Sequence, residues 1–252
     1  MTHKSTSFER LDTRIQRWIW SQHWTELRDA QEQAIPLILD AKNDVIIAAA
    51  TAAGKTEAAF LPILSHMLQD GDDNYLTICI SPLKALINDQ YLRLELLCEQ
   101  LDIDLWPWHG DISASVKSRF TKQPRGVLLI TPESLEAMLC NKGFSAARIF
   151  AQLKYIVVDE LHAFIGSERG KQLQSLMHRM DQAIGRKSPR IGLSATLGDM
   201  SLAAEFLRPL AGSDVQVINS PSSGGELRIL VKGYVEQAPK QESEQTSDTI
   251  PV

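Results

Sequence analysis

Short apolar runs alternate with longer segments of helical periodicity from residue 44 onward. Runs such as VIIAAA and GVLLIT are apolar at consecutive positions, a pattern typical of strands covered on both faces of a sheet. Strands that alternate with helices form βα units with parallel pairing. The pattern therefore predicts an α/β fold with a mostly parallel sheet and helices on both faces. The expected strands span residues 44–50, 76–81, 104–109, 126–131, 155–159 and 190–194.

The segments between these runs carry apolar side chains at helical spacing, so their stripes are expected to fill the core. Pro62 lies beyond the first turn of the helix expected after Lys55, and proline removes one backbone hydrogen bond, so we expect a kink or an early end there. Both ends of the chain are expected to be less tightly organised. Two β-like runs follow at 215–218 and 227–235, and the polar residues 238–252 predict a flexible tail or interdomain linker.

Composition narrows the classes of protein that remain. The chain has 252 residues and a net charge of −5, so a nucleic-acid partner would have to meet local basic patches. Three widely spaced cysteines, Cys79, Cys98 and Cys140, predict neither a disulfide framework nor a zinc site. No secretory leader and no run of eighteen apolar residues is visible. We therefore expect a cytoplasmic protein without a membrane partner.

A phosphate-binding loop is indicated where the run DVIIAAA passes into TAAGKT and then into a helix. Backbone amides and a helix N-terminus at such a turn bind phosphate oxygens. Lys55 is expected on the β- and γ-phosphates, and the Thr56 hydroxyl on magnesium. Ala49 and Ala52 stand where glycine is usual. The alternative is a small-residue turn with a solvated lysine. The expected nucleotide contacts are Thr51, Ala52, Ala53, Gly54, Lys55, Thr56 and Glu57.

Two adjacent carboxylates, Asp159 and Glu160, follow the apolar run 153–158. Ligands in open α/β sheets bind at the carboxyl ends of strands. Asp159 suits magnesium coordination, and Glu160 could polarise the water that attacks a γ-phosphate. The alternative is a helix N-cap with a favourable dipole interaction. We expect this pair and the phosphate loop to lie at the ends of two neighbouring strands.

Motifs in this order resemble those of superfamily 2 helicases. Gln31, the loop 49–56, DELH at 159–162 and SAT at 194–196 resemble the Q motif and motifs I, II and III, with DELH typical of the DExH subgroup. SPLKALINDQ at 81–90 and TPES at 131–134 are similar to motifs Ia and Ib. WHGD at 108–111 and ERG at 168–170 resemble the Lhr-like group. The resemblance covers residues 27–207.

This resemblance implies a RecA-like P-loop NTPase fold and the first, ATP-binding lobe of a nucleic-acid-dependent ATPase that uses ATP and Mg²⁺. The domain would span 1–237, with 1–26 as an N-terminal extension. By motif position, Gln31 would read adenine, Thr56 and Asp159 would hold the metal, and Lys55, Asp159 and Glu160 would be catalytic. The residues expected to couple hydrolysis to movement are His162, Ser194 and Thr196.

Contacts to DNA or RNA are expected in two segments that each follow a strand and begin a helix. Amides and hydroxyls there can face a phosphate backbone without reading sequence. The candidates are Pro82, Lys84, Thr131, Pro132 and Ser134. A basic, loop-like stretch at 117–125 adds four positive charges. An ordinary solvated surface is the favoured interpretation of that stretch, because it has no interleaved aromatic residues for stacking.

A second RecA-like lobe, which would carry arginines to the γ-phosphate, is not visible after residue 207. We therefore expect this chain alone to be weakly active or inactive, and to work with a second lobe in a longer chain or in a partner. Two alternatives remain. One is a nucleotide-dependent regulatory module, and the other is a non-motor P-loop enzyme such as a nucleotide kinase, which has no use for motifs Ia, Ib and III.

Overall fold

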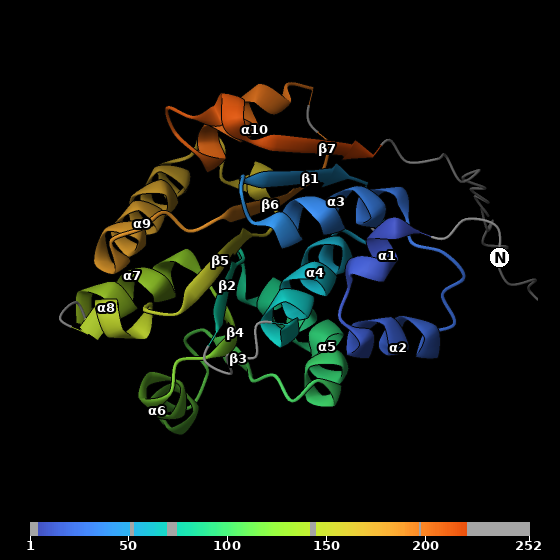
Figure 1. Cartoon of the computed structure of the whole chain (residues 1–252). Coiled ribbons are helices and arrows are strands. Elements are labelled where there is room, and N and C mark those ends of the chain that lie inside the picture. The colour runs from blue at the N-terminus through green and yellow to red at the C-terminus, as the bar shows by residue number, and fades with distance from the viewer. Residues whose placement is uncertain (1–4, 51–52, 70–74, 142–144, 197, 221–252) are drawn as a thin grey trace, which may run out of the picture. The chain divides into compact units, whose positions relative to one another are not determined.

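Seven parallel strands form one sheet in the order β3-β4-β2-β5-β6-β1-β7 (Figure 1). The structure is a computed structural model, and it describes residues 5–50, 53–69, 75–141, 145–196 and 198–220. All six expected strands are confirmed, with ends that differ by at most two residues. The strands are β1 (Val45–Ala49), β2 (Leu76–Ile80), β3 (Leu105–Trp108), β4 (Gly126–Ile130), β5 (Leu153–Val158), β6 (Arg190–Ser194) and β7 (Gln216–Ser220).

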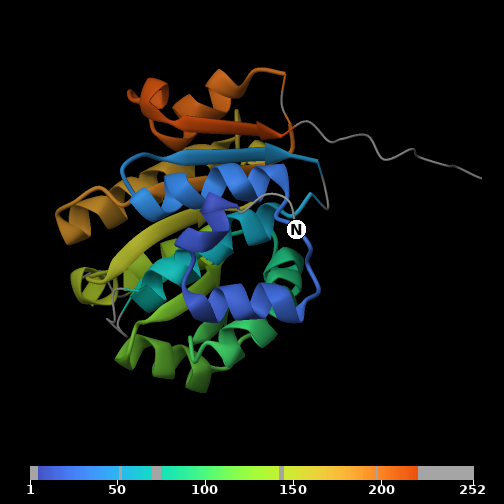
Figure 2. The ribbon, with the colours of Figure 1, turned by 45° about the vertical axis from the view of Figure 1, so that its right-hand side comes forward.

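Helices cover both faces of this sheet, as the continuous apolarity of the strands predicts (Figure 2). One face carries α1 (Thr6–Arg10), α2 (Thr13–Ser21), α3 (Asp29–Asp40), α4 (Lys55–Gln69) and α5 (Lys84–Gln100). The other face carries α6 (Ala114–Lys122), α7 (Pro132–Asn141), α8 (Ala146–Ile149), α9 (Glu168–Ile184) and α10 (Met200–Leu207). Two short 3₁₀ turns, η2 (Leu161–Ala163) and η3 (Gly212–Asp214), complete the described elements.

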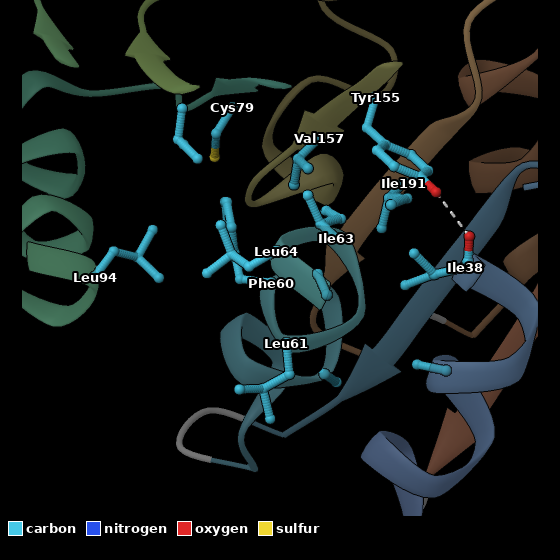
Figure 3. Packing of buried hydrophobic residues seen from close by; sticks show 14 of the residues in the cluster. Ile38, Phe60, Leu61, Ile63, Leu64, Cys79, Leu94, Tyr155, Val157 and Ile191 are labelled. Carbon is cyan, nitrogen blue, oxygen red and sulfur yellow. Dashed lines mark hydrogen bonds between the residues drawn. The ribbon is translucent and has the colours of Figure 1, made fainter. Parts of the chain in front are cut away.

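Alternate residues of each strand enter opposite cores. In β5, Tyr155 and Val157 face α3 and α4, whereas Ile156 and Val158 face the α7–α9 side, because strand side chains alternate between faces. Figure 3 shows the first core, in which Phe60 and Ile63 of α4 pack against the sheet. The Tyr155 hydroxyl donates to the Ile38 carbonyl at 2.9 Å, so even the polar atom of this buried ring has a partner.

The strand order corrects one expectation. The phosphate loop follows β1 and the carboxylate pair follows β5, but β6 lies between these two strands, so the two motifs are not on neighbouring strands. Of the two expectations at Pro62, a kink or an early end, the early end is wrong, because α4 continues to Gln69 with Pro62 buried inside it. Its apolar contacts with the sheet offset the one backbone hydrogen bond that proline removes.

The N-terminal segment is more tightly packed than expected. Leu11, Ile15 and Ile19 are buried in the same core as α3 and α4, and the amide of Asp12 donates to Ser65 of α4. The β-like run 227–235 and the boundary at 237 lie outside the described residues, so that domain limit stays a prediction. Among the helices that the structure describes, none is long and apolar enough to cross a membrane.

Candidate nucleotide and nucleic-acid site

Gly54 closes the described part of the phosphate loop in a conformation that favours glycine. Its φ is +80°, and a Cβ atom there would lie 2.8 Å from Nε2 of Gln31. Gln31 is buried, and its Oε1 accepts a hydrogen bond from the Arg28 amide at 3.0 Å. The first turn of α3 is thereby packed against the loop. This brings two of the predicted nucleotide contacts together, while Thr51 and Ala52 lie outside the described residues.

Lys55 and Thr56 begin α4 directly after this turn, so the amino end of that helix faces the carboxyl edge of the sheet. The Lys55 ammonium donates to the carbonyls of Ala49 and Ala50, at 2.9 and 3.0 Å. These bonds hold the positive charge over the loop. Thr56 is buried at 8% exposure, whereas Ala53 and Glu57 are half-buried.

Asp159 is brought to the same place from the end of β5. It is 5% exposed, and three neutral groups donate to its carboxylate: Ser81 at 3.4 Å, Gln90 at 3.2 Å and the Glu160 amide at 3.0 Å. Burial raises the pKa of Asp159, and repulsion from Glu160 adds to the rise, while the bond from Gln90 opposes it. No cation pairs with this carboxylate among the residues that the structure describes.

Thr56 and Asp159 share one hydrogen-bond partner, although the strands that precede them, β1 and β5, are not adjacent. The Gln90 amide nitrogen donates to Thr56 Oγ1 at 3.3 Å and to Asp159 Oδ2 at 3.2 Å. The two oxygens predicted to hold magnesium are therefore joined through one side chain of α5. One hydroxyl and one uncompensated buried carboxylate fit Mg²⁺, which is commonly bound through one or two protein oxygens together with phosphates and water.

Glu160 adopts a left-handed backbone conformation with φ +48°, a strained state for a residue with a side chain. Its carboxylate lies 3.4 Å from His162 Nδ1, and the same nitrogen accepts from the Ala195 amide at 3.4 Å. A neutral Nδ1 can accept from Ala195, whereas a protonated one can only donate to Glu160. His162, the last residue of DELH, thus contacts the SAT segment, while its predicted coupling role stays a prediction. Ser194 is fully buried and Thr196 is exposed.

The predicted nucleic-acid residues lie at the same edge, after β2 and β4. Lys84 is exposed and forms an ion pair with Asp111 at 2.8 Å. Thr131 uses its hydroxyl to accept from the Ser134 amide at 3.3 Å, so it caps α7. Pro82 and Pro132 are buried, and only their backbone could meet a ligand. The structure therefore brings the five candidates to one edge of the sheet, but several of them are already paired, buried or used to cap a helix.

Arg169 joins these two segments, and sequence reasoning did not assign it a role. Its guanidinium binds both carboxylate oxygens of Glu133, at 2.6 and 3.0 Å, and donates to the Pro82 carbonyl. The next residue, Gly170, has no room for a side chain, because a Cβ there would lie 1.9 Å from the Phe164 carbonyl oxygen. The ERG segment therefore ties the start of α9 to the predicted motif Ia and motif Ib segments.

The basic stretch 117–125 is mostly helical rather than loop-like, because α6 spans Ala114–Lys122. Arg125 pairs with Asp104 at 2.7 Å. Lys117 and Arg119 lie over the rings of Trp108 and Trp106, which are nearly buried. The aromatic partners were not visible in the local sequence because they come from β3. Three of the four charges therefore have partners within the fold, and the interpretation as an ordinary surface stays a prediction.

Gln90 and Ser81 are the other site residues that sequence reasoning missed. A usable signal existed for Gln90: it falls on the same helical stripe as Ile87 and Leu94, both buried, and an amide at a core position needs polar partners. Ser81 directly follows β2 at the carboxyl edge, and its contact with Asp159 depends on the pairing of β2 with β5.

A phosphate loop and a buried carboxylate at the carboxyl edge of a seven-stranded parallel sheet define the class: this is a RecA-like P-loop NTPase domain. The DEAD/DEAH box helicase family matches residues 28–203. The chain therefore belongs to that family, and its likeness to the Lhr group, inferred from the motifs, is confirmed by the relatives described next.

Two curated relatives and one solved structure illustrate this likeness. The ATP-dependent helicase Lhr-Core of Saccharolobus solfataricus is 34% identical over 77% of this chain and 23% of its own length. The Lhr helicase/uracil glycosylase of Escherichia coli is 31% identical over 74% of this chain and 13% of its own length. Mycobacterium smegmatis helicase Lhr, solved with ssDNA and AMP-PNP, superposes on 85% of this chain and 28% of its own with a TM-score of 0.76 and 27% identity. The chain thus spans less than a quarter of the length of these two curated relatives.

Proposed function

We propose that this chain is the ATP-binding lobe of an ATP-dependent DNA or RNA helicase or translocase. The observation that carries the proposal is the meeting of Lys55, Thr56 and Asp159 at one edge of the sheet, with Gln90 between the last two. The solved relative bound to ssDNA and AMP-PNP supports both ligands. A second RecA-like lobe would be supplied by a longer chain or a partner, in keeping with the small share of each relative that is covered. A cytoplasmic location stays a prediction.

In this proposal each side chain has one task. Lys55 exchanges its hydrogen bonds with the loop carbonyls for bonds with the phosphates and neutralises part of their charge. The backbone amides at the amino end of α4 donate hydrogen bonds to the same phosphates. Thr56 Oγ1 and Asp159 would hold Mg²⁺, and the ion would supply positive charge that offsets the charge of the phosphates. Glu160, half-exposed beside them, orients the attacking water. The Lys84 and Thr131 segments meet the sugar-phosphate backbone without reading sequence.

Nucleotide binding tests the proposal directly on the 252-residue chain. We expect Mg²⁺-ATP binding by titration calorimetry, slow hydrolysis without a second lobe, and a loss of affinity of about tenfold or more in Lys55→Ala. Lys42→Ala is the matched control, because Lys42 is exposed and lies before the other end of β1. Equal affinities for the wild type and Lys55→Ala would overturn the nucleotide assignment.

A hydrolysis assay with the downstream sequence restored tests the motor part. Single-stranded DNA and RNA are added separately to the short chain and to the longer one. Stimulation in the longer chain supports a helicase or translocase. Nucleotide binding without stimulation by either nucleic acid would favour the regulatory module, and phosphate transfer to a small acceptor would favour a kinase.

A further inference from the structure

One short segment, residues 81–90, contacts both parts of the proposed site. Its first residue, Ser81, and its last, Gln90, both donate to Asp159. Between them lie Pro82, whose carbonyl is held by Arg169, and Lys84, the candidate phosphate contact. Gln90 follows Lys84 by six residues of continuous α5, which is about 9 Å along the helix axis. A single rigid element therefore links the nucleic-acid edge to the metal ligands.

The Gln90 amide is committed in one orientation. It is 6% exposed, and its nitrogen faces two acceptors, Thr56 Oγ1 and Asp159 Oδ2. A flipped amide would turn Oε1 towards the Asp159 carboxylate, which can only accept, and would lose that bond. With both amide hydrogens used, Oε1 is buried without a partner among the described residues.

From this geometry we infer that Gln90 is a positioning residue for the metal site. It holds Thr56 and Asp159 at a fixed separation and connects them, through α5, to the candidate nucleic-acid residues Pro82 and Lys84. The inference rests on the proposed function, because it concerns the same nucleotide site. It adds a second connection between nucleic acid and nucleotide, through other side chains than the one predicted through His162 and the SAT segment.

Gln90→Leu is the decisive variant, because leucine has a similar volume but cannot make either hydrogen bond. We expect nucleotide binding without Mg²⁺ to stay within about twofold of wild type, while most of the gain in affinity that Mg²⁺ gives is lost, about five- to tenfold, as for outer residues of other metal sites. A fluorescent ATP analogue titrated with and without Mg²⁺ measures both. Gln100→Leu, at the exposed end of the same helix, is the matched control and should behave as wild type.

Folding is checked by thermal unfolding of each variant, and Gln90→Asn serves as a second variant that keeps an amide but is too short to reach both partners. If Gln90 only fills the core, Gln90→Leu should keep the full Mg²⁺ effect, and the inference is then overturned. If the wild type itself binds no nucleotide, the proposed function fails first. A wild type with a Mg²⁺ effect that Gln90→Leu fully shares leaves the function standing and removes only this inference.

Hydrogen exchange tests the connection along α5 without nucleic acid. Adding the Mg²⁺-nucleotide complex should slow amide exchange in residues 83–88 of the wild type, because the metal ligands fix Gln90 and the helix with it. The same addition should leave these amides unchanged in Gln90→Leu at nucleotide concentrations that saturate it. Unchanged exchange in the saturated wild type would show that no signal passes along this segment.

Discussion

Two groups of buried polar side chains lie at opposite ends of the strands, and they differ in charge. Before β1 and β6, the carboxylates of Asp44 and Asp181 face the guanidinium groups of Arg190 and Arg208, so two negative charges meet two positive ones. After β1, β2 and β5, Thr56, Ser81 and Gln90 surround the single carboxylate of Asp159. The first group is balanced, and the second carries an uncompensated charge.

The difference separates residues that stabilise the fold from residues to which the proposed function assigns a ligand. At the balanced end, Arg208 also donates to the Ser188 carbonyl and Arg190 to the Leu207 carbonyl, which fastens the end of α10 to the sheet. Surface hollows flank this end and Arg208 lines two of them, but its charge is already neutralised, so they are not assigned as anion sites. At the other end, a buried carboxylate with only neutral donors costs stability unless a cation joins it.

Asp181→Asn should produce the largest change in stability. The substitution keeps the side-chain volume but leaves Arg190 and Arg208 with one carboxylate, and breaking a buried ion pair costs about 3–5 kcal/mol. Chemical denaturation measures the free energy of unfolding. Asp214→Asn, on an exposed residue of η3, is the control and should change it by less than about 0.5 kcal/mol. A loss below about 1 kcal/mol for Asp181→Asn would mean that the balanced group is not what holds this end.

Gly54→Ala should have the next largest effect. Alanine at φ +80° costs about 1–2 kcal/mol in backbone strain, and its Cβ would also lie 2.8 Å from Gln31. Gly185→Ala is matched, because Gly185 ends α9 near Asp181 with φ +69° and no atom within 4 Å of an added Cβ. The excess loss at Gly54 therefore measures the Gln31 contact. That excess should disappear when Gln31→Ala is combined with Gly54→Ala, and its persistence would contradict the contact.

Asp159→Asn is the same chemical change as Asp181→Asn, but its effect should have the other sign or vanish. Removing an unpaired buried charge relieves a desolvation cost, and ligand sites commonly give up stability of about 1 kcal/mol for function. We expect the free energy of unfolding to stay level or rise by about 1 kcal/mol, while Mg²⁺-nucleotide binding falls. A loss as large as that of Asp181→Asn would remove the distinction between the two groups.

Much of the fold was predictable because the strands are continuously apolar and short. Runs such as VIIAAA remove their side chains from water only in a sheet that is covered on both faces. The predicted ends of the strands were therefore correct to within two residues. The strand order was not predictable in the same way. Local sequence does not say which strands pair, and β6 therefore came between the two strands that were expected to be neighbours.

The site residues also differ in how far local sequence could predict them. Lys55, Thr56 and Asp159 could be named because each follows a strand at a recognisable turn. Gln90 and Arg169 act through side chains that reach across from α5 and α9, and such contacts depend on packing rather than on local pattern. The ion pair of Lys84 with Asp111 was hidden for the same reason, since the two residues lie on different elements and are joined only in the fold.

The ion pair of Lys84 with Asp111 extends the comparison from buried charges to exposed ones, and changing it should have the smallest effect. Lys84 and Asp111 are 65% and 68% exposed, so the pair adds little to stability. The bond lowers the pKa of Asp111 and raises the pKa of Lys84.

Asp111→Asn should free the Lys84 ammonium for phosphate and tighten binding of single-stranded DNA about two- to threefold at low salt, with a steeper salt dependence. Asp89→Asn removes a carboxylate paired with Arg93 on the same helix and changes the net charge equally. Fluorescence anisotropy of a labelled oligonucleotide compares the two variants. An equal gain in both would show that net charge alone acts, and that Lys84 has no special place on the nucleic-acid edge.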